Sequence, residues 1–344
     1  MILPQTYVGT LAVLILSVLF LGLWANGYKL AGKLRFELFY FDFAIGLGLA
    51  AVIYGFTLGN LGYDGFSLMD DLMHAGKRQW FFGFLAGVIF NLANLFLMAA
   101  ISVAGMAVAF PVSLGVTLLV GVLVSQLGQR TGNTTYVALG WALLLAAIVA
   151  DAVAYRSLVA RRRAAVLAAS TKKKTRGPTA TKGLVLSVLS GLLMLLFYPL
   201  LNRARVEEIG VGSYALMILF AAGAFLSTFV FNLFFMNLPV EGQPLEIRDY
   251  LGMRAGRHLF GVLGGVLCGT GTLAAFVAAG VAPEARLGQA ATAALSHGGT
   301  LVAALCGLLA WKEFQEGTGN VKALAFITVI LFAGGLASLS LAFR

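Results

Sequence analysis

Ten apolar stretches, each about 20 residues long, follow one another along this chain and leave few folds open to it. In a bilayer every backbone polar group has to be satisfied within the protein, which for segments of this length means α-helices. We therefore predict an all-α integral membrane protein with about ten transmembrane helices. The predicted spans are 7–27, 36–58, 80–102, 106–128, 134–155, 183–203, 212–237, 259–280, 287–310 and 321–343.

Composition supports this prediction and excludes a soluble protein. Hydrophobic residues make up 60% of the chain and charged residues 11%, whereas soluble domains have roughly 45–50% apolar and about 25% charged residues. The basic residues behind the net charge of +10 lie between apolar stretches, so we assign them to membrane topology and expect no nucleic acid partner. The first 28 residues contain no Lys or Arg, so we expect the first apolar stretch to stay as a span rather than be a cleaved signal peptide.

The basic residues are also distributed unevenly between the two sides of the predicted bundle. The segment from Arg156 to Lys182 contains nine Lys and Arg residues and no acidic residue. Lys- and Arg-rich loops stay in the cytoplasm, and placing this segment there puts 17 of the 24 basic residues on the inner side. We therefore predict a multi-pass protein of the cell membrane (inner or plasma membrane), with a cytoplasmic central loop and both termini extracytoplasmic.

Two patterns recur in the first and second halves of the chain. The spacing G-x-x-x-G at 83–87 returns at 261–265, and S-x-G-x-T-L at 113–118 returns at 296–301. Five helices is an odd number, so a tandem repeat of five must be inverted in the membrane, as in many secondary transporters with a substrate site between the halves. The predicted parts are a first five-helix repeat at 1–156, a flexible basic cytoplasmic linker at 157–181 and a second five-helix repeat at 182–344.

This layout and three short motifs resemble a known group of transporters. Ten helices in two sets of five with a basic central loop resemble the drug/metabolite transporter superfamily. The motifs FYFDF at 39–43, LPVEGQPL at 238–245 and WKEF at 311–314 are similar to its ureide permease branch. The related glucose/ribose and rhamnose porters share the layout.

The resemblance implies proton-coupled uptake of allantoin and similar oxo-heterocycles, including uracil-like bases. Similarity to the sugar porters implies monosaccharide/proton symport instead, and export of a metabolite is a further alternative within the superfamily. Either way the expected driving force is a proton gradient, with no cofactor. The central loop lacks the phosphate-loop-like motif of plant ureide permeases.

Ionisable side chains within a span are costly and usually serve function. Asp42 lies nearly two turns inside its predicted span, and we predict that it couples proton movement to transport. The alternative is a structural pair with a cytoplasmic lysine. Glu37 is the second proton-coupling candidate, and its alternative is a solvated interfacial acid paired with Arg35 or Lys33.

Two further acids have weaker claims to a role. Asp151 lies about one turn from the inner end of its predicted span, so we expect it at the membrane interface. Glu313 is expected to pair with Lys312 or Lys322, as an inner gate or a topology anchor.

A neutral polar substrate needs aromatic faces and hydrogen-bonding groups among apolar walls. Several such side chains fall within or at the ends of the predicted spans, and the alternative for each is hydrogen bonding between helices. The predicted substrate-binding residues are Trp24, Asn26, Tyr40, Asn91, Asn94, Tyr198, Gln289, Thr292, Ser296 and His297.

Other classes of protein find less support. The chain has no H-E-x-x-H or G-x-S-x-G motif and no clustered metal ligands, so we predict neither an enzyme nor a metal site. A membrane sensor or scaffold is the non-transport alternative. The expected partners are a small-molecule substrate and the lipid bilayer, and the sequence leaves a homodimer open.

Overall fold

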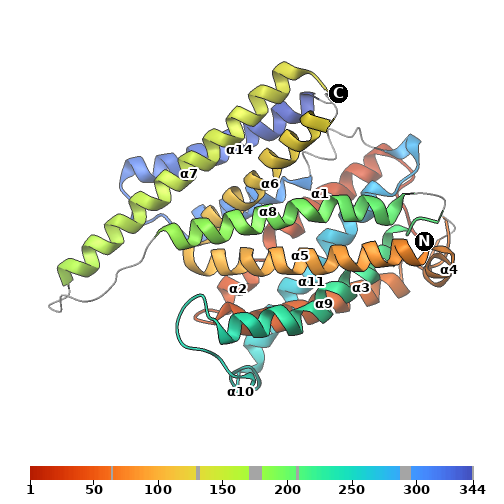
Figure 1. Ribbon diagram of the computed structural model, residues 1–344, viewed down its shortest axis with the longest axis horizontal. Helices are drawn as coiled ribbons and strands as arrows, with labels where there is room; N and C mark the ends of the chain where they lie inside the picture. Colours follow the sequence, from red (N-terminus) through yellow and green to blue (C-terminus); the bar gives the residue numbers. More distant parts are fainter. Residues whose placement is uncertain (63–64, 129–131, 170–179, 207–208, 287–295, 343–344) are drawn as a thin grey trace. The chain divides into compact units, whose positions relative to one another are not determined.

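The computed structural model describes residues 1–62, 65–128, 132–169, 180–206, 209–286 and 296–342, and Figure 1 shows them as helices joined by short connections. The helices are α1 (Tyr7–Leu23), α2 (Asn26–Leu30), α3 (Phe36–Phe56), α4 (Leu68–His74), α5 (Lys77–Ala104), α6 (Met106–Gly128), α7 (Thr134–Ala169), α8 (Ala180–Arg205), α9 (Ser213–Asn237), α10 (Ile247–Leu251), α11 (Ala255–Ala279), the 3₁₀ turn η1 (Pro283–Ala285), α13 (Gly299–Leu305), the π-helical turn η2 (Cys306–Ala310) and α14 (Gly319–Ala342). The prediction of an all-α integral membrane protein is confirmed.

Nine helices within the described ranges are long and apolar enough to cross a membrane. They are α1 continued by α2, then α3, α5, α6, α7, α8, α9, α11 and α14. The remaining predicted span, 287–310, is described only from Ser296 onward, where Gly299–Ala310 forms a shorter apolar helix. Residues 287–295 lie outside the described part of the chain, so this span stays a prediction.

The chain forms two compact units, and each draws on both predicted repeats. The first unit contains Met1–Leu95 and Leu193–Gly299, and the second contains Phe96–Leu192 and Thr300–Arg344. This division concerns which segments pack together, so the repeat boundaries and their inversion stay predictions.

Glycines allow the helices of the first unit to pack backbone against backbone. Gly87 of α5 lies against the carbonyl of Phe220 in α9, and Gly265 of α11 lies against the carbonyl of Phe43 in α3. A side chain at either position would collide with the neighbouring backbone. Small residues at helix contacts are characteristic of membrane bundles, where lipid supplies no hydrophobic drive for helix association. The second glycine of each predicted G-x-x-x-G pattern therefore lies at a close helix contact.

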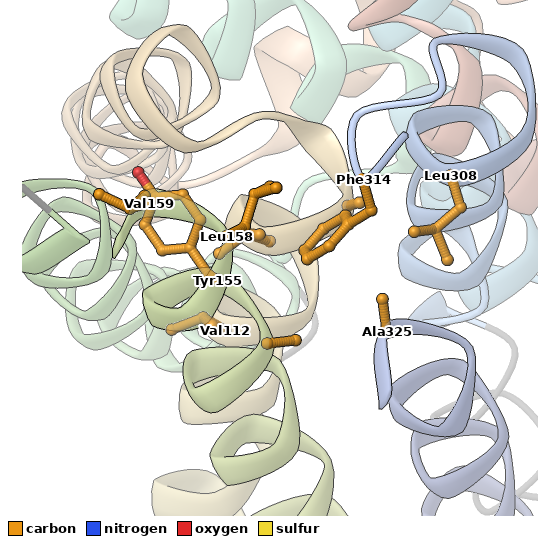
Figure 2. Packing of buried hydrophobic residues seen from close by; sticks show 10 residues of the cluster. Val112, Tyr155, Leu158, Val159, Leu308, Phe314 and Ala325 are labelled. Atoms are coloured by element: carbon orange, nitrogen blue, oxygen red, sulfur yellow. The ribbon is translucent and has the colours of Figure 1, made fainter. Parts of the chain in front are cut away.

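The second unit is built on the packing of α7 against α14 and α6. Gly140 faces Leu339, and Leu144 faces Gly335, so α7 and α14 run antiparallel. Figure 2 shows the apolar cluster at one end of this packing, where Phe314 points from the segment before α14 toward α7. The labelled members of the cluster are Val112, Tyr155, Leu158, Val159, Leu308, Phe314 and Ala325.

Two connections bear on the sequence predictions. The third and fourth spans form a tight hairpin, as their near-continuity indicates, because Gly105 alone separates α5 from α6 with φ of 89°. In contrast, α7 continues to Ala169, so the start of the segment predicted as a flexible linker is helical. Residues 170–179 of that segment lie outside the described residues.

Candidate functional site

Helix α3 places three polar side chains in the interior of the first unit. Glu37 and Tyr40 are fully buried and Asp42 is 2% exposed. Most residues of this helix are buried, because it packs against both α9 and α11. A helix buried on most sides turns its polar residues toward protein rather than lipid, which makes α3 the centre of the candidate site.

Tyr40 links α3 to α5 through two hydrogen bonds. Its hydroxyl donates to the backbone carbonyl of Asn91 at 3.2 Å, and the side-chain amide of Asn94 donates to the same hydroxyl at 3.2 Å. The structure therefore brings together three of the predicted substrate-binding residues, Tyr40, Asn91 and Asn94. Their phenol and amide groups can both donate to and accept from a polar solute.

Asn91 and Asn94 differ in how their side chains are used. The Asn91 amide donates to Ser227 of α9 at 2.9 Å, and its carbonyl accepts from Thr228 at 3.2 Å. The Asn91 side chain therefore links α5 to α9, which agrees with the alternative role of hydrogen bonding between helices. Within the described part of the chain the Asn94 side chain bonds only to Tyr40, so it is the better placed of the two to contact a solute.

Asp42 has two partners from the other half of the chain. The hydroxyl of Tyr250 in α10 donates to its carboxylate at 2.7 Å, and Nδ1 of His258 in α11 lies 2.9 Å from the second carboxylate oxygen. Asp42 therefore pairs with a histidine rather than with a cytoplasmic lysine. Burial, followed by the hydrogen bond and charge of Asp42, raises the pKa of Tyr250 above its ordinary value, so Tyr250 stays a donor near neutral pH.

Sequence reasoning missed both partners of Asp42. They lie 208 and 216 residues away from it along the chain, and nothing in the local sequence marks this pairing.

Glu37 is engaged by a local arginine. Arg35 reaches both carboxylate oxygens, with Nη2 at 2.6 Å and Nε at 3.2 Å, and Asn232 of α9 donates to the Glu37 carbonyl at 2.7 Å. The guanidinium also donates to the carbonyl of Gln243, within the LPVEGQPL segment. The pair with Arg35 matches the structural alternative for Glu37, but the acid is buried rather than solvated.

The two candidates near the end of α1, Trp24 and Asn26, contact different parts of the first unit. Trp24 is buried, with its ring centre 5.0 Å from that of Phe43 on α3, next to Tyr40. Asn26 instead donates to the carbonyl of Leu23, at the turn between α1 and α2. Trp24 therefore belongs with the α3 residues, whereas the Asn26 side chain bonds to its own turn.

Tyr198 and His297 form the second aromatic group. Their ring centres are 5.9 Å apart, and Nδ1 of the buried His297 has no hydrogen-bond partner in the described chain. Ser296 beside it is half-buried. Gln289 and Thr292 lie outside the described residues, so both stay predictions.

In the second unit, Glu313 caps a helix and Asp151 is buried. The Glu313 carboxylate accepts from the backbone N–H groups of Met106 and Ala107 at 3.0 and 2.8 Å, so it caps the start of α6. Free N–H groups at a helix start attract an anion. The expected pairing with Lys312 or Lys322 stays a prediction. Asp151 is 1% exposed, so it is buried within this unit, and its depth in the membrane stays a prediction.

An apolar groove on the first unit lies apart from these polar groups. It has a volume of about 390 Å³ and is lined by residues of α3 and α9, among them Gly48 and Phe225. Its lining offers a polar solute no side-chain hydrogen bond, so the buried polar residues of α3 and α5 remain the candidate site.

Long apolar helices with polar side chains buried among them define a polytopic membrane protein. No protein-family model matches the chain. It is similar to ureide permease 1 of Arabidopsis thaliana, with 24% identity over 384 aligned positions that cover 96% of each chain. It is also similar to ureide permease 2 of the same plant, with 23% identity covering 98% of each chain. The predicted class, a membrane transporter and not an enzyme, is confirmed, since these relatives are named as permeases.

A solved structure shares the fold. It is described only as a crystal structure of a protein, and it matches with a TM-score of 0.53 and 16% identity over 99% of this chain and 100% of the other. At this identity the likeness concerns the fold alone.

Proposed function

We propose that this chain is a secondary active transporter that takes up a small polar solute of the ureide or nucleobase type, driven by the proton gradient. The observation that carries the proposal is the similarity to two ureide permeases over nearly the full length of each chain. A match that covers all the spans supports a shared transport unit more strongly than a shared motif does.

The chemistry of the candidate site suits such a solute. Allantoin and uracil-like bases carry ring N–H donors and carbonyl acceptors and have no strongly charged group. Tyr40 and Asn94 offer a hydroxyl and an amide on the interior faces of α3 and α5, and Trp24 adds an aromatic surface nearby. A few polar groups among apolar walls are what binding sites for small neutral molecules require.

Asp42 is the proposed proton-coupling residue, with Glu37 as the second candidate. A buried carboxylate that loses its charge also loses part of its attraction for His258 and Tyr250, which lie on α11 and α10. Protonation of Asp42 therefore offers a way to change how these elements contact α3.

The organisation proposed around this site follows the drug/metabolite transporter layout. It has two inverted five-helix repeats, a cytoplasmic central loop and extracytoplasmic termini. The proposal requires no cofactor other than the proton gradient. Uptake of a monosaccharide with protons and export of a metabolite are alternatives of the same kind, and a membrane sensor or scaffold is the non-transport alternative.

A ligand screen on the purified protein tests the proposal. A ligand that binds only the folded state at 100 times its Kd stabilises that state by about 2.7 kcal/mol. We expect allantoin or a uracil-like base to raise the unfolding temperature, and monosaccharides at the same concentration to leave it unchanged. Stabilisation by a monosaccharide and by no ureide or nucleobase would favour the sugar alternative.

A further inference from the structure

Asp151 is a buried acid that does not belong to the candidate site described above. It lies midway along α7 in the second unit and is 1% exposed. Neither oxygen of its carboxyl group has a hydrogen-bond partner among the residues that the structure describes. Its neighbours on the same face of α7 are apolar, with Ile148 and Ala154 packed into the core. An acid in this position has nothing to stabilise a negative charge.

The helix that faces Asp151 does not neutralise it. Continuing the antiparallel register of α7 and α14 places Asp151 opposite Thr328. Thr328 is uncharged, and its hydroxyl donates to the carbonyl of Leu324 in its own helix. The basic residue on α14 is Lys322, which is exposed near the start of that helix.

The other described elements around Asp151 bring no buried cation either. Helix α6 contains no titratable residue. On α7 the hydroxyl of Tyr155 donates to the carbonyl of Val103, and Arg156 is exposed. On α8 the nearest basic residue, Lys182, is exposed.

Among the described residues, further charged groups lie on the segment before α14. Lys312 and Glu316 are exposed there, and Glu316 pairs with Arg162. Glu313 is the charged group whose field acts on Asp151.

Glu313 lies at a position that favours a negative charge. It accepts two backbone N–H groups at the start of α6, where the helix dipole favours negative charge. A side chain at Gly105 or Gly307 would collide with its carboxylate, so the surrounding backbone is shaped to this group. The contacts of Glu313 favour a negative charge at its position, whereas Asp151 lies in the apolar interior within the field of Glu313.

We propose that Asp151 carries a proton in the resting protein and is a second proton-binding site, separate from Asp42. A conformational change that admits water to this part of α7 lets Asp151 release its proton to water on one side of the membrane. Asp151 then takes up another proton from water on the other side. The role of this proton in driving transport rests on the proposed function, whereas the presence of the proton does not.

Infrared spectroscopy of the purified protein in lipid vesicles tests the resting state without any substrate. A protonated carboxyl group gives a carbonyl stretching band that shifts on exchange into D₂O and is absent from a carboxylate. We expect this band at neutral pH in the wild type and in Glu316→Gln, and its loss in Asp151→Asn. A band of unchanged intensity in Asp151→Asn, or no such band in the wild type, would overturn the proposal.

Transport measurements then test the coupling. In vesicles with an imposed pH gradient, we expect Asp151→Asn to reduce accumulation of labelled allantoin at least tenfold while exchange across equal concentrations continues. Glu316→Gln, which removes an exposed acid of the same unit, should behave as the wild type. Full accumulation by Asp151→Asn, or accumulation driven by sodium in place of protons, would remove Asp151 from the coupling.

The two measurements separate this proposal from the proposed function. If the wild type neither exchanges nor accumulates any ureide or nucleobase, the proposed substrate class fails, and the infrared band still decides whether Asp151 is protonated. If Asp151→Asn does not fold, the infrared spectrum of the wild type at raised pH replaces it. If the carbonyl band of the protonated carboxyl group gives way to a carboxylate band only well above neutral pH, the proposal is supported. If this change occurs below neutral pH, the proposal is contradicted.

Discussion

The hydroxyl of Tyr250 donates a hydrogen bond of 2.7 Å to the carboxylate of Asp42, although the two residues lie 208 positions apart in the chain. His258 approaches the same carboxylate at 2.9 Å. One acid on α3 thus joins the short helix α10 and the start of α11. A change in the charge of Asp42 therefore acts on three segments together.

Asp42→Asn should separate proton coupling from substrate movement. The amide imitates the protonated acid in shape, so we expect counterflow exchange of a substrate to persist and accumulation driven by a pH gradient to fall at least tenfold. Tyr250→Phe is the matched control, because it removes the donated hydrogen bond and leaves the acid in place. If Asp42→Asn accumulates substrate as the wild type does, coupling must reside elsewhere, with Glu37 or Asp151 as the next candidates.

Asn91 and Asn94 should respond differently to the same substitution. Asn91→Ala removes two hydrogen bonds between α5 and α9, with Ser227 and Thr228, and each lost bond costs about 0.5–1.5 kcal/mol of stability. Both hydroxyls keep a bond to a carbonyl of their own helix. Asn94→Ala removes a single bond to Tyr40, so we expect a smaller loss of stability and weaker ligand binding. Thermal unfolding with and without ligand measures both effects. Equal ligand affinity in Asn94→Ala and the wild type would exclude Asn94 from the binding site.

Two glycines of α3 provide a matched test of helix packing. The added methyl group of Gly46→Ala would meet the backbone of Val262 in α11, and overpacking of this kind costs about 1–3 kcal/mol. Gly48→Ala meets no atom within 4 Å and should be neutral or stabilising by up to about 1 kcal/mol, since alanine favours a helix. Comparison of their unfolding temperatures in one detergent checks this, and equal destabilisation by both would contradict the close contact of α3 with α11.

Asp71 should make stability depend on pH. This residue of α4 is 3% exposed and accepts the N–H of Gly212 at the start of α9. Burial raises its pKa above the ordinary value of 3.8, although the hydrogen bond from Gly212 opposes this. The folded state therefore binds the proton more tightly than the unfolded state does. The stabilisation from this bound proton is fully present below the pKa of Asp71 in the unfolded chain. It is lost as the pH rises through the pKa of Asp71 in the folded protein.

The measurement is the unfolding temperature of the wild type and of Asp71→Asn from about pH 4 to pH 8. Raising the pH across this window should lower the stability of the wild type relative to Asp71→Asn, which has no proton to lose. A difference between the two proteins that is constant with pH, or that changes in the opposite direction, would show that the pKa of Asp71 is not raised.

The spans and the hairpin could be predicted from sequence because their causes are local. A run of about 20 apolar residues specifies a membrane helix wherever it occurs, and Gly105 adopts the left-handed conformation that a one-residue connection needs. The extension of α7 to Ala169 was missed, because the basic and polar residues of 157–181 suggested a flexible linker. Alanine, leucine and arginine are nevertheless strong helix formers, so composition contained the signal.

The candidate site was less predictable because its contacts join distant segments. The pair of Arg35 and Glu37 follows from their closeness in sequence, and it was among the alternatives. The bond between Tyr40 and Asn94 and the partners of Asp42 depend on how α3 packs on α5, α10 and α11. Sequence patterns mark which residues are unusual within a span, but they do not specify which helices meet.

Transport by the purified protein in lipid vesicles tests the central claim most directly. Vesicles with an alkaline interior and labelled allantoin or uracil outside should accumulate the label above the external concentration. Collapse of the pH gradient with a proton carrier should bring the level back to equality. Vesicles with the protein that take up no more label than empty vesicles, for every ureide and nucleobase tested, would contradict the proposed function.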